Sequence, residues 1–153
     1  MNWDVFTRLS PLEIQIHWAT AVLAFFLGLV IFALPKGTRT HKIIGWVYVA
    51  AILVTAFAAI FVRTFEDDGG MPTLMGYSPI HLFIPLTFFG IGGALVAIRH
   101  GKVKSHKRAM IGTFLGALIV AGLFTFIPGR HMWAFFFAEP EMVQRWLETA
   151  GGN

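Results

Sequence analysis

The sequence contains no cysteine and few charged residues. Of its 153 residues, 13% are charged and 56% are hydrophobic, against roughly 45–50% apolar residues in a typical soluble domain. The absence of cysteine excludes a disulfide framework, a thiolate metal site and covalent attachment of a c-type haem. The sequence also lacks a nucleotide-binding loop, a serine elbow and a metalloprotease signature, so no catalytic residue is predicted. Histidine must therefore provide any ligand chemistry.

Charged residues are also missing from four long stretches, residues 14–35, 43–62, 71–98 and 110–129. Each stretch can cross a bilayer as a helix, which takes about 20 apolar residues. The tail that follows has apolar residues at the spacing of an interfacial amphipathic helix. We therefore predict an all-α, integral membrane four-helix bundle in one domain. The expected domain covers residues 1–130, with spans at about 11–34, 42–63, 79–99 and 106–127, and the tail covers residues 131–153.

Acidic residues are absent from the two loops that join span one to span two and span three to span four, whereas basic residues gather there. Because basic loops stay on the cytoplasmic side of a membrane, we expect both termini on the non-cytoplasmic side. This charge distribution indicates contact with membrane lipid rather than with nucleic acid. The basic residues are Lys36, Arg39, Lys42, Arg99, Lys102, Lys104, Lys107 and Arg108.

The histidines indicate an internal repeat. His17 and His41 in the first half are matched by His81 and His106 in the second half. His41 follows His17 by 24 residues, and His106 follows His81 by 25 residues. Each half is thus predicted to be a helical hairpin, and an axis along the membrane normal relates the two. The matched strings are Ile16-His17 with Ile80-His81, and Thr40-His41-Lys42 with Ser105-His106-Lys107.

Hydroxyl residues mark the expected starts of the second and fourth helices. Thr40 and Ser105 each precede a His-Lys pair. Ser and Thr are favoured N-cap residues, so we expect these two side chains to cap their helices.

The repeat predicts two histidine pairs, one near each membrane face. Ionisable groups at membrane depth are costly and usually face the bundle interior, which suggests a site. A b-type haem needs two neutral imidazoles from neighbouring helices and space between them. We therefore predict cofactor or metal binding by His17 with His81, and by His41 with His106. The competing interpretation is that His41 and His106 are interface anchors and that the helix glycines serve close packing.

A metal site is the alternative at the non-cytoplasmic face. Glu13 lies one turn before His17, and His131 lies beyond the fourth span. Together with His81 these residues offer the nitrogen and oxygen donors that zinc or copper prefers. A third alternative is a scaffold or assembly subunit of a membrane complex, in which the histidines bind nothing.

Four strings carry a likeness to a known family: LPKGTRTHKIIGWVY at residues 34–48, SPIH at 78–81, SHKRAM at 105–110 and AGLF at 121–124. They resemble the predicted bacterial membrane proteins classed as domain of unknown function 2306. The likeness covers most of residues 11–130. It implies four helices in a bacterial inner (plasma) membrane, and it brings no established activity.

The plan of the bundle also resembles the core of the cytochrome b-561 family, in which histidine pairs on alternate helices hold one haem near each face. By position, the resemblance implies an outer haem b on His17 and His81 and a cytoplasmic haem b on His41 and His106. It implies a transmembrane dihaem electron carrier between a quinol and an outer-face acceptor, a cytochrome b-type oxidoreductase. Quinone, a homo-oligomer or a larger membrane complex are the expected partners.

Overall fold

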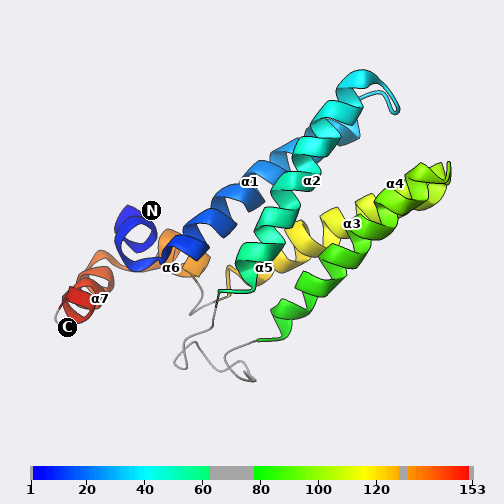
Figure 1. Ribbon diagram of the computed structural model, residues 1–153. Coiled ribbons are helices and arrows are strands. Elements are labelled where there is room, and N and C mark those ends of the chain that lie inside the picture. Colours follow the sequence, from blue (N-terminus) through cyan, green and yellow to red (C-terminus); the bar gives the residue numbers. More distant parts are fainter. Residues whose placement is uncertain (1, 63–77, 128–130, 152–153) are drawn as a thin grey trace.

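The computed structural model describes residues 2–62, 78–127 and 131–151, and the regular structure in these ranges is entirely helical (Figure 1). This confirms the predicted all-α fold class. The elements are η1 (Val5–Leu9), α1 (Leu12–Ala33), α2 (Arg39–Ala59), η2 (Pro79–Leu82), α3 (Phe83–Arg99), α4 (Val103–Thr113), η3 (Phe114–Val120), α5 (Ala121–Phe124), α6 (His131–Phe137) and α7 (Pro140–Gly151).

In the described part of the chain, four helical segments are long and apolar enough to cross a membrane. The third segment combines η2 with α3, and the fourth combines α4, the π-helical turn η3 and α5. These segments carry the apolar runs of the sequence, because a helix satisfies all its backbone polar groups internally and can therefore lie in lipid. The four segments are Leu12–Ala33, Arg39–Ala59, Pro79–Arg99 and Val103–Phe124.

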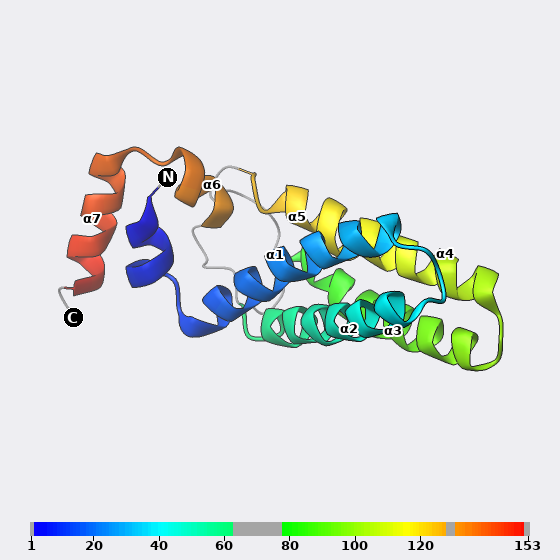
Figure 2. The ribbon, with the colours of Figure 1, turned by 90° about the horizontal axis from the view of Figure 1, so that it is seen from above.

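The segments form two helical hairpins, α1 with α2 and α3 with the fourth segment, which lie against each other (Figures 1 and 2). Each hairpin turns at a glycine in the left-handed region, Gly37 with φ +80° and Gly101 with φ +69°. Glycine adopts this conformation without a steric penalty. In the first turn, the Lys36 ammonium donates hydrogen bonds to the carbonyls of Ile31 (2.7 Å) and Phe32 (2.9 Å), which caps the end of α1.

Both predicted N-caps are wrong. Thr38, not Thr40, caps α2, and its hydroxyl accepts a hydrogen bond of 3.2 Å from the His41 N–H. After the turn at Gly37, Thr38 is extended with ψ 163°, so Thr40 already lies inside the helix. Likewise, α4 begins at Val103 directly after the Gly101 turn, so Ser105 lies within its first turn. In both hairpins the glycine turn starts the helix earlier than the hydroxyl residue suggested.

The two hairpins meet where large side chains pack on small ones. Phe114 is 4% exposed and packs on Gly28 of α1. Within the second hairpin, the Thr113 side chain packs on Gly90 of α3 in the same way. Such small residues let membrane helices approach closely. The buried core at this contact consists of Ala24, Ile31, Tyr48, Val49, Ala51, Ile52, Ile91 and Phe114.

Many other large apolar side chains point away from the bundle. Phe89 of α3, for example, is 78% exposed. Exposed apolar surface of this extent is unusual for a soluble monomer. It agrees with the expected contact between the spans and membrane lipid.

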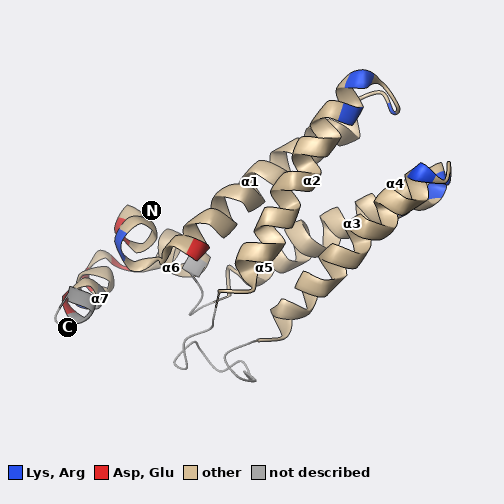
Figure 3. Cartoon of the chain, viewed as in Figure 1, with Lys and Arg blue, Asp and Glu red and all other residues tan. Residues whose placement is uncertain are grey.

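The two ends of the molecule differ in charge (Figure 3). The Lys and Arg residues of both hairpin turns lie at the same end of the molecule, which we call the basic end. At the other end, η1, α6 and α7 pack around a small apolar cluster, and we call these three helices the cap. The buried members of that cluster are Val5, Ala134, Ala138 and Val143.

Candidate functional site

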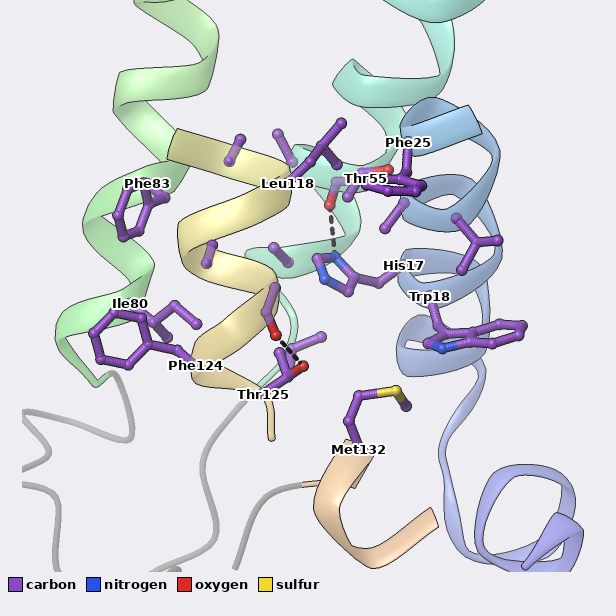
Figure 4. A pocket seen from close by; sticks show the side chains of 18 of the residues that line it. His17, Trp18, Phe25, Thr55, Ile80, Phe83, Leu118, Phe124, Thr125 and Met132 are labelled. Atoms are coloured by element: carbon purple, nitrogen blue, oxygen red, sulfur yellow. Dashed lines mark hydrogen bonds between the residues drawn. The ribbon is translucent and has the colours of Figure 1, made fainter. Parts of the chain in front are cut away.

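A cavity of about 530 Å³ lies among the spans toward the cap. Its volume falls within the roughly 300–1,000 Å³ of pockets that bind small molecules. Side chains from α1, α2, α3, the fourth segment and α6 line it, and most of them are apolar (Figure 4). The polar side chains in the lining are His17, Trp18, Thr55, His81, Thr87 and Thr125.

His17 extends from α1 into this cavity (Figure 4). Its Nδ1 lies 2.9 Å from the Thr55 carbonyl oxygen on α2. Because a carbonyl only accepts, Nδ1 carries the proton and donates, which leaves the Nε2 lone pair free. The Thr55 hydroxyl in turn donates to the Thr20 hydroxyl at 2.8 Å, which adds a second polar link between α1 and α2. Histidines that bind metals show the same arrangement, with one nitrogen donating to a carbonyl and the other facing the ligand.

His81 lines the same cavity but uses both ring nitrogens. Its Nε2–H donates to the Val62 carbonyl at 2.8 Å. Its Nδ1 accepts a hydrogen bond of 3.2 Å from the Ser78 N–H. His81 therefore joins the start of the third segment to the residues that follow α2. The structure brings His17 and His81 to one cavity, and in this arrangement only the His17 nitrogen has a free lone pair.

His41, in the first turn of α2, and His106, in the first turn of α4, both lie at the basic end. The His106 Nδ1–H donates to the Ala94 carbonyl of α3 at 3.0 Å, so its Nε2 lone pair is free, as in His17. The His41 Nδ1 is buried and has no hydrogen-bond partner among the described residues. Neither residue lines the 530 Å³ cavity.

The residues of the alternative metal site are only partly described. Glu13 is half-buried in the first turn of α1, and His131 begins α6, with its side chain outside the described part of the chain. Within residues 2–62, 78–127 and 131–151, no three His, Asp or Glu side chains gather closely enough to hold a metal ion. The zinc or copper site therefore stays a prediction.

A family model described as a predicted membrane protein, DUF2306, matches residues 14–149. This range includes both histidine pairs and most of the cap. The chain belongs to the DUF2306 family. Its membership confirms the family resemblance and the membrane assignment, while the likeness to the cytochrome b-561 plan stays a prediction. No curated protein and no solved structure matches this DUF2306 chain.

The sequence patterns did not point to Thr87 and Thr125, which also line the cavity of this DUF2306 protein. Thr87 donates its hydroxyl proton to the Phe83 carbonyl at 2.7 Å, and Thr125 donates to the Gly122 carbonyl at 2.6 Å. Both hydroxyl protons are already donated to carbonyls of the same helix, and the His17 Nε2 carries no proton. The two hydroxyl oxygens and the His17 Nε2 can therefore accept hydrogen bonds from a ligand in the cavity. Threonines inside apolar spans were the available signal, because polar residues within the membrane often mark a site.

Proposed function

We propose that this DUF2306 protein is a b-type haem protein that carries electrons across the membrane. The observation that supports the proposal is the His17 imidazole, whose free Nε2 faces an apolar cavity of about 530 Å³. Haem iron takes a neutral imidazole as its axial ligand. A carbonyl on the second ring nitrogen, here that of Thr55, holds such a ligand in the correct tautomer and orientation.

The lining of the cavity agrees with a flat, largely apolar cofactor. Small side chains stand along the walls, and among the residues that the structure describes no Lys or Arg belongs to the lining. Haem propionates would therefore have to lie toward the cavity mouth. When bound, haem supplies a one-electron iron couple, and the protein supplies the ligand and a dry site. The small lining residues are Ala21, Ala56, Ala59, Ala117, Ala121 and Gly122.

The basic end would hold the second haem. In His106, as in His17, Nδ1 carries the proton and the Nε2 lone pair is free, and the buried His41 Nδ1 at the same end has no hydrogen-bond partner among the described residues. Two sites at opposite ends of the spans would let electrons cross the bilayer. We further propose that the basic end is cytoplasmic in a bacterial inner membrane, and that the cap end meets the outer-face electron acceptor.

His81 is the residue on which the coordination of the cap-end haem depends. To serve as the second haem ligand, His81 would have to release the Val62 carbonyl that its Nε2–H now contacts at 2.8 Å, and that carbonyl would then need another donor.

The test is a dithionite-reduced minus oxidised visible spectrum of the detergent-purified protein, with a pyridine haemochrome count per chain. We expect a sharp α band and about two haems per chain, because four axial histidines are available. His17→Ala and His106→Ala should each remove one haem. His100→Ala is the matched control, since this exposed imidazole donates to the Val96 carbonyl of its own helix. A protein without a Soret band after expression with ample haem would refute the proposal.

A quinol site is the second candidate function, and the acceptor character of the cavity favours it. His17 Nε2 and the oxygens of Thr87 and Thr125 can accept hydrogen bonds, so they suit an apolar molecule that carries a hydroxyl donor. If no haem is present, titration with decylubiquinol should quench the fluorescence of Trp18 in the lining, and His17→Ala should weaken this quenching. Metal analysis of Glu13→Ala separates the zinc or copper alternative from both.

A further inference from the structure

The cavity has a roof that does not belong to the spans. Met132 and Phe136 of α6 belong to its lining, and Met132 enters from the cap side, near Trp18 of α1 (Figure 4). Met132 is buried and Phe136 remains partly exposed. The helix α6 therefore covers part of the cavity on the cap side.

The N-terminal segment, residues 2–10, holds α6 in place through hydrogen bonds. The Asn2 backbone N–H donates to the Phe135 carbonyl at 2.8 Å. The Asn2 side-chain amide donates to the Ala138 carbonyl at 2.7 Å and lies 3.4 Å from that of Ala134. The last carbonyls of a helix have no partner within the helix. Asn2 thus supplies donors that the end of α6 needs.

Apolar contacts join the same two parts of the chain. Val5 of η1 is buried against Ala134, Ala138 and Val143 in a cluster separate from the bundle core. Trp3 packs edge-on against Phe135, with ring centroids 5.3 Å apart. The roof is therefore held by a small interface of its own.

The N-terminal segment is in turn fixed to α1. The Phe6 ring lies 4.8 Å from the Trp18 ring and 6.3 Å from the Phe135 ring, centroid to centroid, so Phe6 bridges the span and the roof. The Gln15 side chain donates to the Ser10 carbonyl at 2.9 Å. In contrast, the backbone bond from α6 to the fourth segment, from Trp133 N–H to Thr125 O, is long at 3.3 Å.

We propose that α6 is a lid over the cavity and that the N-terminal segment is its latch, with Asn2 as the latching residue. When the Asn2 bonds and the Val5 contacts break, α6 and α7 can move away from η1 and expose the cavity to the cap side. When they form, Met132 and Phe136 close over the ligand and exclude water. The gating role rests on the proposed ligand site, whereas the latch itself does not.

The latch is tested first without any ligand, by hydrogen exchange of the α6 amides in the purified protein. Asn2→Ala removes the side-chain bonds, each worth about 0.5–1.5 kcal/mol net, so exchange in α6 should rise about tenfold. Val5→Ala should act in the same direction. Thr7→Ala is the matched control, because this exposed hydroxyl donates within its own segment, to the Trp3 carbonyl. Equal exchange in Asn2→Ala and Thr7→Ala would overturn the latch.

Gating is tested by the release of haemin to excess apomyoglobin. Asn2→Ala should speed release about tenfold while leaving the spectrum of the loaded protein unchanged, and Thr7→Ala should match the wild type. If haemin does not bind, the haem proposal fails, and the rate of decylubiquinol binding replaces the release rate. Faster exchange in α6 without faster release or binding, or a cavity that takes neither probe, would overturn the lid.

Discussion

Replacement of Gly28 by alanine tests how the two hairpins are held together. A Cβ at this position would lie 2.5 Å from Cε2 of Phe114 and 3.3 Å from Cε2 of Tyr48. Both rings are almost fully buried, so neither can move aside without disturbing the core. Overpacking of this kind costs about 1–3 kcal/mol. We therefore expect Gly28→Ala to lower the free energy of unfolding by that amount.

Gly45→Ala is the matched control for this prediction. Gly45 is also a helical glycine, on α2, and a Cβ there would meet nothing within 4 Å. Since alanine favours a helix over glycine by about 1 kcal/mol, this variant should be neutral or more stable. Both are measured by SDS titration in dodecyl maltoside with far-UV circular dichroism. If Gly28→Ala is as stable as Gly45→Ala, Phe114 does not pack on Gly28 in the membrane fold.

Three further substitutions can be followed in the same titration. Tyr48→Phe should leave the free energy of unfolding unchanged or raise it by up to about 2 kcal/mol, because the buried phenol has no hydrogen-bond partner among the described residues. A clearly lower free energy of unfolding would show that the hydroxyl does have a partner. Gly37→Ala should cost about 1–2 kcal/mol from the left-handed φ of +80° alone, since its Cβ would meet no atom within 4 Å, and an unchanged midpoint would contradict that turn. His106→Ala should cost about 0.6 kcal/mol for the lost bond to the Ala94 carbonyl and remove one haem from the haemochrome count; an unchanged count would exclude His106 as a ligand.

The fold was predictable because lipid imposes a simple requirement on the chain. A charge-free stretch of about 20 residues can satisfy its backbone in a bilayer as a helix, so four such stretches and two basic turns specify two hairpins. The helix starts were less predictable. A hydroxyl before a His-Lys pair suggested Thr40, but the backbone conformation of Gly37 decided in favour of Thr38.

The candidate site was predicted in part. The repeat predicted His17 with His81 and His41 with His106. The structure places the first pair in one cavity, and the second pair in the first turns of two helices at the basic end. The sequence repeat could not reveal which ring nitrogens of these histidines are free, because their hydrogen-bond partners are backbone carbonyls. The partner of His17 is 38 residues away in sequence, and that of His81 is 19 residues away. Because every residue has a backbone carbonyl, the sequence does not indicate which carbonyl a histidine contacts, and the structure is needed to identify it.

The contact between Asn2 and the end of α6 also sets an order of events during synthesis. The bond from Asn2 to Ala138 joins residues 136 positions apart, so it can form only after residue 138 has been synthesised. All four spans precede α6 in the sequence, so their residues are synthesised before the helix that covers the cavity. Until Asn2 contacts the end of α6, the cavity is not closed from the cap side. We expect any cofactor that is too large to pass the closed α6 to enter in that interval.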